Sequence, residues 1–495
     1  MFKDIKKIEI LAILAIFVLY FVSRLVSLNN FPIFTDEAIY LRWAQIAKND
    51  ANWRFISLTD GKQPLYIWLT MVAMKVIDDP IMAGRLVSVL AGVLTILGLI
   101  LLGKILFERW RVGILAAGLY SILPFALVYD RLALMDGLLA GLMLWALIFE
   151  IILIRTLRLD VALILGGIIG FTILTKTSGF FALYLLPISL IFFDFRQKEK
   201  IKRLAKWFGL VLVVLLVSQT MYSVLRLSPF FHLIAQKDKT FIYPFSEWLT
   251  HPLTFFLGNL RGLNEWSVDY FTLPIILSAL LGLVWGIKFS KERLILFSWF
   301  IIPFLGLALF GRVIYPRFVF FMTIPLLLLS GYFLHQIAIP KKWLVAILLL
   351  VVVLIPVRID FDLLIDPTKA RIPRADSNQY FNDWPSGWGI KESIKFFQEK
   401  AQKEKITVFT EGTFGLLPAA LELYLVDNKN ISIKGIWPVP EEPTAEILEQ
   451  AKAQPTYIVF FQNQPPHKWP LEKILEFKKG RTERYHTVYQ LKLRK

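Results

Sequence analysis

The sequence predicts a bundle of membrane-spanning helices. Charged side chains whose positions the bundle alone does not explain gather at one face of it. Asp136 is the clearest case, because a carboxylate inside a span costs about 2.5–3.5 kcal/mol at mid-bilayer and usually serves a site or a partner. Simpler explanations stay open: a salt bridge of Asp136 to Arg131, and lysine side chains that reach along the interface to water. Acids and bases together indicate a site that handles a phosphate and a proton. The residues at this face are Asp36, Glu37, Lys62, Asp130, Arg131, Asp136, Lys176, Arg312 and Arg317.

The stretch Phe34-Thr35-Asp36-Glu37-Ala38-Ile39-Tyr40 places two adjacent acids directly after the first apolar segment. That segment, residues 9–27, is long enough to cross a bilayer, which takes about 20 residues. The acids therefore emerge at the far membrane face, and the apolar spacing of residues 37–48 predicts a helix on the membrane surface. A helix N-terminus by itself favours acids, because its free N–H groups and its dipole are positive. Capping and chemistry are both open explanations for the pair.

The composition is that of a polytopic α-helical membrane protein. Hydrophobic residues make up 56% of the 495 residues, and 41 of them are Phe. The formal net charge of +17 indicates cytoplasmic loops before it indicates a nucleic-acid partner, because Lys and Arg collect on the cytoplasmic side of spans. The chain has no cysteine, which excludes disulfides, thiolate metal sites and cysteine nucleophiles.

Eleven apolar segments are predicted to cross the membrane. The loop after the sixth segment carries Arg196, Lys206 and four further cations between them. This basic loop places the N-terminus in the cytoplasm and residues 28–80 and 227–270 in outer loops. The eleven segments are 9–27, 82–106, 112–129, 133–154, 161–175, 179–193, 207–226, 271–288, 294–310, 318–337 and 343–357.

An odd number of spans leaves residues 358–495 outside, after a membrane domain of residues 1–357. Charged residues become more frequent in this tail, and apolar runs shorten. The patterns predict strands at 405–410, 456–461 and 484–493 and helices at 389–403 and 443–453. The tail is therefore predicted to form a small extracytoplasmic α/β domain.

Five short blocks in the first two hundred residues resemble the ordered blocks of the glycosyltransferase C superfamily. The most similar branch is the bacterial one that includes protein O-mannosyltransferases of family 39 (dolichyl-phosphate-mannose protein mannosyltransferase-like) and aminoarabinose transferases. The blocks are Thr-Asp-Glu-Ala-x-Tyr at 35–40, Lys-Gln-Pro-Leu-Tyr-x-Trp-Leu at 62–69, Ala-Gly-Arg-Leu at 83–86, Arg-Leu-Ala-Leu-Met-Asp at 131–136 and Leu-Thr-Lys-Thr-Ser-Gly at 174–179.

The resemblance implies an enzyme that moves a hexosyl or pentosyl group from a polyprenyl-phosphate donor to a protein or glycolipid acceptor outside the cell. By position, Asp36 is the catalytic base with Glu37 beside it, and Asp136 is a supporting acid. The leaving lipid phosphate needs cationic stabilisation, and the attacking hydroxyl needs a base, which gives direct displacement with inversion. The chain departs from the family pattern at Gln63, where proline is common, and at the inserted Thr177-Ser178. The candidate phosphate ligands are Lys62, Arg131, Lys176 and Arg317.

This scheme requires no cofactor, although Asp36, Glu37 and Asp136 also offer oxygen ligands that suit a divalent metal ion. A polytopic lipid or sugar transporter or flippase is the main alternative, and a membrane-anchored receptor is another. Transporters often contain inverted repeats and charges at the midplane, whereas here the two halves do not match and the unusual charges lie at one face. The sequence does not identify the sugar or the acceptor.

Overall fold

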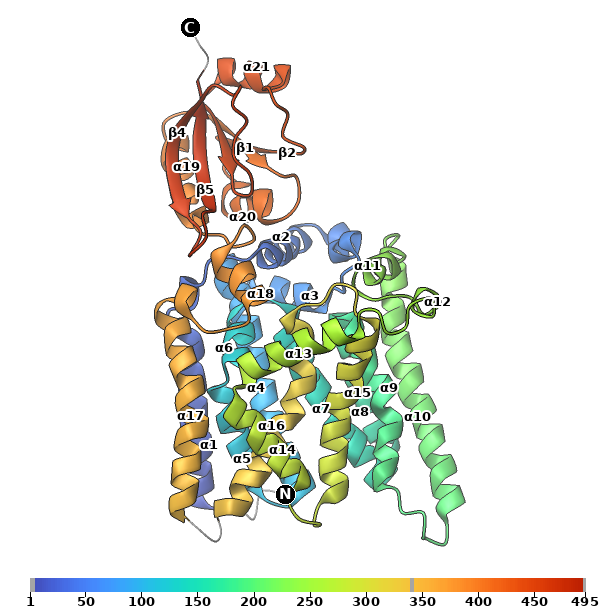
Figure 1. Cartoon of the computed structure of the whole chain (residues 1–495). Helices are drawn as coiled ribbons and strands as arrows, with labels where there is room; N and C mark the ends of the chain where they lie inside the picture. Colours follow the sequence, from blue (N-terminus) through green and yellow to red (C-terminus); the bar gives the residue numbers. More distant parts are fainter. Residues whose placement is uncertain (1–4, 339–341, 493–495) are drawn as a thin grey trace.

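The computed structural model describes residues 5–338 and 342–492, which form a helical membrane part and a smaller α/β part above one end of it (Figure 1). A helix or a run of short helices lies at each of the eleven predicted segments, so the predicted fold class is confirmed. These elements are α1 (Lys7–Leu25), α4 (Pro80–Phe107), α5 (Trp110–Ser121), α6 (Pro124–Arg131), α7 (Met135–Thr156), α8 (Leu159–Thr175), α9 (Phe181–Leu185), α10 (Lys200–Ser223), α14 (Leu273–Val284), α15 (Ser290–Phe310), α16 (Phe320–Ala338) and α17 (Lys342–Ile365). Helix α13 (Phe256–Phe271), directly before α14, lies almost wholly in the predicted loop 227–270.

Within the described ranges, six helices are long and apolar enough to cross a membrane, or up to eight if each of two bent pairs counts as one span. The pair α5 and α6 bends by 66°, and α13 and α14 by 103°. Each second helix has a proline near its start, Pro124 or Pro274, where the missing N–H and the fixed φ end the preceding helix. The eleven-span count and the boundary at residue 357, which falls inside α17, stay predictions.

Short helices lie across the end of the bundle that is next to the α/β part (Figure 1). The predicted surface helix is present as α2, and α3 follows it after the turn that carries Lys62. The long outer loop folds into α11 and α12 before it enters α13. Their bounds are α2 (Thr35–Asn49), α3 (Leu65–Ala73), α11 (Leu233–Phe241), α12 (Phe245–Trp248) and α18 (Arg374–Ser377).

The C-terminal part has a mixed sheet in the order β2-β1-β3-β5-β4, in which β1, β2 and β3 are parallel and β5 is antiparallel to both β3 and β4. The three predicted strands correspond to β1, β3 and β5, and the two predicted helices to α19 and α21. The elements are α19 (Ile390–Ala401), β1 (Ile406–Glu411), α20 (Leu416–Leu425), β2 (Ile431–Ile436), α21 (Ala445–Ala453), β3 (Thr456–Phe460), β4 (Leu471–Lys478) and β5 (Tyr485–Leu491).

Contacts at the start of α2 join the two parts. Phe34 forms an antiparallel bridge with Ser386, and the Thr35 N–H donates to the Pro385 carbonyl over 3.1 Å. Farther along α2, the Trp43 ring lies 6.2 Å from that of Phe414, centroid to centroid. Helix α2 is therefore held between the bundle and the C-terminal part, which fixes the direction of its first turn.

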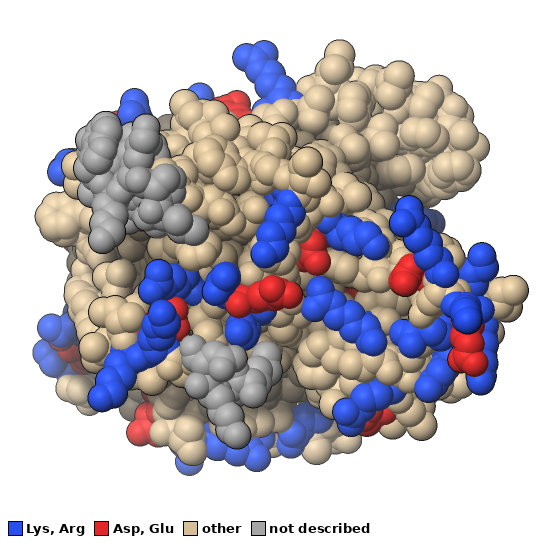
Figure 2. Space-filling view, turned by 90° about the horizontal axis from the view of Figure 1, so that it is seen from below, with Lys and Arg blue, Asp and Glu red and all other residues tan. Residues whose placement is uncertain are grey.

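The face of the bundle opposite the C-terminal part carries many Lys and Arg side chains (Figure 2). Such a distribution is the one expected of a cytoplasmic face. It supports the predicted orientation, which stays a prediction.

Candidate active site

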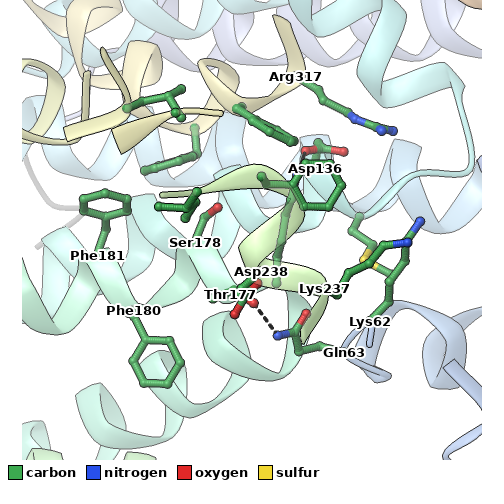
Figure 3. A pocket seen from close by; sticks show the side chains of 18 of the residues that line it. Lys62, Gln63, Asp136, Thr177, Ser178, Phe180, Phe181, Lys237, Asp238 and Arg317 are labelled. Carbon is green, nitrogen blue, oxygen red and sulfur yellow. Dashed lines mark hydrogen bonds and ion pairs between the residues drawn. The ribbon is translucent and has the colours of Figure 1, made fainter. Parts of the chain in front are cut away.

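A cavity of about 400 Å³ is lined by residues from the ends of several bundle helices and from the connections between them (Figure 3). One side of the cavity is polar and includes four of the predicted site residues. The other side is apolar and aromatic, with residues from α9, α15 and α16. The polar lining consists of Tyr40, Lys62, Gln63, Asp136, Lys176, Thr177, Ser178, Lys237, Asp238 and Arg317, and the apolar lining includes Phe180, Phe181, Tyr184, Leu307, Phe310, Phe318 and Phe321.

Asp36 lies in the first turn of α2 and faces two cations. Its Oδ2 accepts a hydrogen bond from Arg317 Nη1 at 2.7 Å, and its Oδ1 lies 3.5 Å from Lys62 Nζ. Lys62 also donates to the Tyr40 hydroxyl at 3.1 Å. Tyr40 follows Asp36 by one helical turn, so both side chains lie on the same face of α2. The structure therefore brings together three predicted residues that are far apart in sequence.

The two cations determine the charge of the Asp36 carboxyl. Burial raises its pKa, but the Lys62 ammonium and the Arg317 guanidinium lower it by more, so the net pKa lies well below the usual aspartate range. Burial lowers the pKa of both cations and Asp36 raises it, and both net values lie above their usual ranges. All three groups are therefore ionised at neutral pH.

Asp136 and Lys176 form a second ion pair in the cavity lining. Lys176 Nζ donates to Asp136 Oδ1 at 2.7 Å and lies 4.5 Å from the centre of the Phe318 ring. Lys176 directly follows α8, and Asp136 lies in the first turn of α7. Burial lowers the pKa of Lys176, and the nearby Asp136 offsets this only in part. The salt bridge of Asp136 to Arg131, considered as a simpler explanation, is absent from the described ion pairs, since Asp136 pairs with Lys176.

Glu37 points away from the cavity and is fully buried. Its Oε1 and Oε2 accept from Arg85 Nε and Nη2 at 2.9 and 3.0 Å. The Phe34 N–H donates to Oε2 at 3.0 Å, and the Ala133 N–H donates to Oε1 at 2.7 Å. Glu37 thus caps α2 and ties it to α4 and to the turn before α7, and it does not join Asp36 in contacting the cations of the cavity.

Arg131 is also buried outside the cavity lining. Its Nη1 donates to the carbonyls of Ser23, Arg24 and Val26, and its Nη2 donates to that of Ser27. These carbonyls belong to the end of α1 and the turn after it, where carbonyls lack partners within the helix. Of the seven predicted site residues, Lys62, Asp136, Lys176 and Arg317 line the cavity. Asp36 contacts two of these cations without being part of the lining, and Glu37 and Arg131 lie elsewhere.

No group of three or more His, Asp or Glu residues that could hold a metal ion is present in the described part of the chain. The three acids considered as oxygen ligands each face a cation instead: Asp36 faces Lys62 and Arg317, Glu37 faces Arg85, and Asp136 faces Lys176. Their arrangement is one of separate ion pairs. The prediction that no cofactor is required stays a prediction.

The two departures from the family pattern contact each other. The Gln63 side chain donates to Thr177 Oγ1 over 2.7 Å, as Figure 3 shows. Residues that follow Lys62 and Lys176 are thereby joined, and the hydrogen bond fixes the two turns that hold these lysines relative to each other.

Sequence reasoning missed Lys237 and Asp238, which α11 contributes to the cavity lining. Lys237 donates to Asp60, also missed, over 2.7 Å. The available signal was the charged run Lys237-Asp238-Lys239 in a loop predicted to lie outside, where lysines are less common than in cytoplasmic loops.

Comparisons with known proteins agree with this fold. Residues 61–222 match the family model described as dolichyl-phosphate-mannose-protein mannosyltransferase. No curated protein matches the chain.

Solved structures resemble the chain along nearly its whole length. ArnT from Cupriavidus metallidurans bound to undecaprenyl phosphate superposes with a TM-score of 0.59 at 16% identity, covering 97% of both chains. The apo form of the same protein gives 0.57 at the same identity and coverage. The Archaeoglobus fulgidus oligosaccharyltransferase gives 0.52 at 13% identity, covering 90% of this chain and 68% of that one. At such identities these likenesses show the fold.

The helical bundle with an α/β part at one end is therefore the fold of these solved ArnT and oligosaccharyltransferase structures, and residues 61–222 resemble the mannosyltransferase family. The matched region contains four of the five blocks, and the block at 35–40, which holds Asp36 and Glu37, precedes it.

Proposed function

We propose that the protein transfers a sugar from a polyprenyl-phosphate donor to an acceptor at the outer face of the cell membrane, with inversion at the sugar carbon. In this scheme the N-terminus is cytoplasmic and the C-terminal part is extracytoplasmic. Asp36 is the base, Lys62 and Arg317 bind the donor phosphate, and Asp136 with Lys176 supports that site. Glu37 and Arg131 are assigned to structure, because neither lines the cavity: the Glu37 carboxylate is paired with Arg85, and both terminal nitrogens of Arg131 donate to backbone carbonyls.

The observation that carries the proposal is the pair of cations on either side of Asp36. Arg317 bonds Asp36 through Nη1, and within the described ranges its buried Nε has no hydrogen-bond partner. A buried guanidinium with a donor to spare suits an incoming phosphate, because arginine binds phosphate oxygens through paired N–H groups. The relative from C. metallidurans is a structure with undecaprenyl phosphate bound, which supports a lipid phosphate as the ligand class here.

The apolar half of the cavity fits the lipid part of such a donor. Phe181 and Tyr184 from α9 and Leu307 and Phe310 from α15 line it, and the Tyr184 side chain is exposed on the surface of the bundle. Apolar and aromatic walls accept a polyprenyl chain from the bilayer, since they bury apolar surface without leaving a polar group unpaired.

In this arrangement one group removes the proton of the acceptor hydroxyl, and two others stabilise the charge on the leaving phosphate. A hydroxyl oxygen of the acceptor attacks the sugar carbon, its proton passes to Asp36, and the bond to the phosphate oxygen breaks with its electron pair on that oxygen. The phosphate group gains a negative charge, which the two fixed cations stabilise. Because the phosphate competes with Asp36 for those cations, donor binding raises the pKa of Asp36 and makes it a better base only when the donor is present.

Transfer of labelled sugar tests the proposal directly. Purified protein in lipid vesicles is supplied with polyprenyl-phosphate sugars and with extracts that contain glycolipid or protein acceptors. The unaltered protein is expected to transfer label, and Asp36→Asn is expected to lose about 10²–10⁴-fold, the usual contribution of a general base. Transport of the donor across the vesicle membrane without transfer to any acceptor would support a flippase instead.

A further inference from the structure

Asp60 lies between two lysines that come from distant parts of the chain. Its Oδ2 is 3.7 Å from Lys62 Nζ, and its Oδ1 accepts from Lys237 Nζ at 2.7 Å. The three side chains and Asp36 therefore form a line of alternating charges, Asp36, Lys62, Asp60 and Lys237. Lys237 is the terminal cation of this line, and it comes from α11 of the long outer loop.

Helix α11 is packed against the turn that carries Lys62. Gly61 has φ +65°, and a side chain there would meet the Leu233 carbonyl oxygen at 2.5 Å and Lys237 Cβ at 2.6 Å. Only glycine fits such a close approach at this backbone conformation. The contact holds Lys237 next to Asp60, so the ion pair is a fixed feature of the site.

We propose that Lys237 is a positioning residue that neutralises Asp60, so that Lys62 stays available to the phosphate of a lipid donor. This inference rests on the proposed function. Lys62 Nζ lies near two carboxylates, and a phosphate must compete with both for it. Asp36 has Arg317 as a second cation and Asp60 has Lys237, so three cations face two carboxylates and leave one positive charge for the ligand. Without Lys237 the charges balance, and Asp60 holds Lys62 more strongly.

Binding of undecaprenyl phosphate to the purified full-length protein in detergent tests this role without knowledge of the sugar or the acceptor. Lys237→Met is expected to raise the Kd about tenfold, the effect of losing about 1.4 kcal/mol. Adding Asp60→Asn to that variant removes the competing carboxylate, and the double variant is expected to bind within about twofold of the unaltered protein, because paired sites are non-additive. Lys239→Met is the matched control, because this exposed lysine lies on the same helix.

The rescue distinguishes charge balance from simple anchoring of α11. If Lys237 served only to hold α11 in place, the double variant would bind as poorly as Lys237→Met, and the proposal would be overturned. Equal binding by Lys237→Met and the unaltered protein would also overturn it while leaving the proposed function intact. Should Lys237→Met fail to fold, Asp60→Asn alone is decisive: binding at least as tight as that of the unaltered protein supports the proposal, and weaker binding contradicts it. Failure of the unaltered protein to bind undecaprenyl phosphate would overturn the proposed function itself.

Discussion

Glu37→Gln tests whether the second acid of the Asp36-Glu37 pair belongs to the fold or to the chemistry. Both Glu37 and Arg85 are fully buried, and the carboxylate accepts four N–H groups. Glutamine keeps one acceptor oxygen but turns an NH₂ group toward donors, and it leaves the Arg85 charge unpaired. Removing one partner of a buried ion pair costs about 3–5 kcal/mol. We therefore expect a large loss of stability.

The assay is thermal unfolding of the purified variant in detergent, followed by the loss of the monodisperse peak on size exclusion. The midpoint of Glu37→Gln is expected to fall clearly below that of the unaltered protein. Glu37→Gln combined with Arg85→Met removes both charges and is expected to be more stable than Glu37→Gln alone. A variant that unfolds like the unaltered protein but transfers no sugar would refute this reasoning and return Glu37 to the catalytic group.

Three further predictions concern pH and metal. Burial raises the pKa of Asp376 to about 7, although the Tyr129 and Tyr270 hydroxyls donate to it. Between about pH 4 and 7 the folded state therefore binds more protons than the unfolded state. The free energy of unfolding falls as pH rises through that window. Asp376→Asn is expected to flatten this slope in unfolding midpoints measured from pH 5 to 8, and an unchanged slope would contradict the assignment. Asp136→Asn removes the carboxylate that raises the pKa of Lys176, so Lys176 loses its charge at a lower pH in this variant. The affinity of the variant for the donor is therefore expected to weaken more steeply above neutral pH than that of the unaltered protein. Kd values measured across pH test this expectation. Transfer is expected to survive incubation with EDTA, and a loss that Mg²⁺ or Mn²⁺ restores would show that a metal ion takes part.

The membrane part of the fold could be predicted from the sequence because apolar length determines which segments can cross a bilayer. Segments such as 82–106 and 133–154 correspond closely to α4 and α7. The bends between α5 and α6 and between α13 and α14 were missed. They depend on prolines and turns inside apolar stretches, where hydropathy does not change.

The candidate site could be predicted only in part. Some of its residues follow from the predicted topology, and others depend on the direction of the side chain. Asp36, Asp136 and Lys176 lie near the ends of predicted spans and Lys62 lies in the loop 28–80, so the predicted topology brings all four to one face. Whether each of the remaining side chains reaches the cavity depends on the direction in which it points from its helix. Glu37 follows Asp36 by one residue, about 100° around α2, and its side chain turns to Arg85 instead of the cavity.

Arg131 and Lys237 both show that tertiary packing decides which side chains reach the site. Arg131 lies in a matched block, yet its guanidinium closes the end of α1 through four backbone carbonyls. Lys237 lies in a loop without a matching block and reaches the site only because α11 packs against Gly61. Such contacts depend on tertiary packing, and no local pattern contains that information.

The most direct test of the account is the affinity of Asp36→Asn for undecaprenyl phosphate, measured beside its transfer activity. If Lys62 and Arg317 are the phosphate ligands and Asp36 is the base that competes for them, the variant binds the lipid phosphate more tightly than the unaltered protein and transfers almost no sugar. Weaker binding would show that Asp36 holds the two cations in place for the phosphate. Normal transfer would show that Asp36 is not the base and would contradict the central claim.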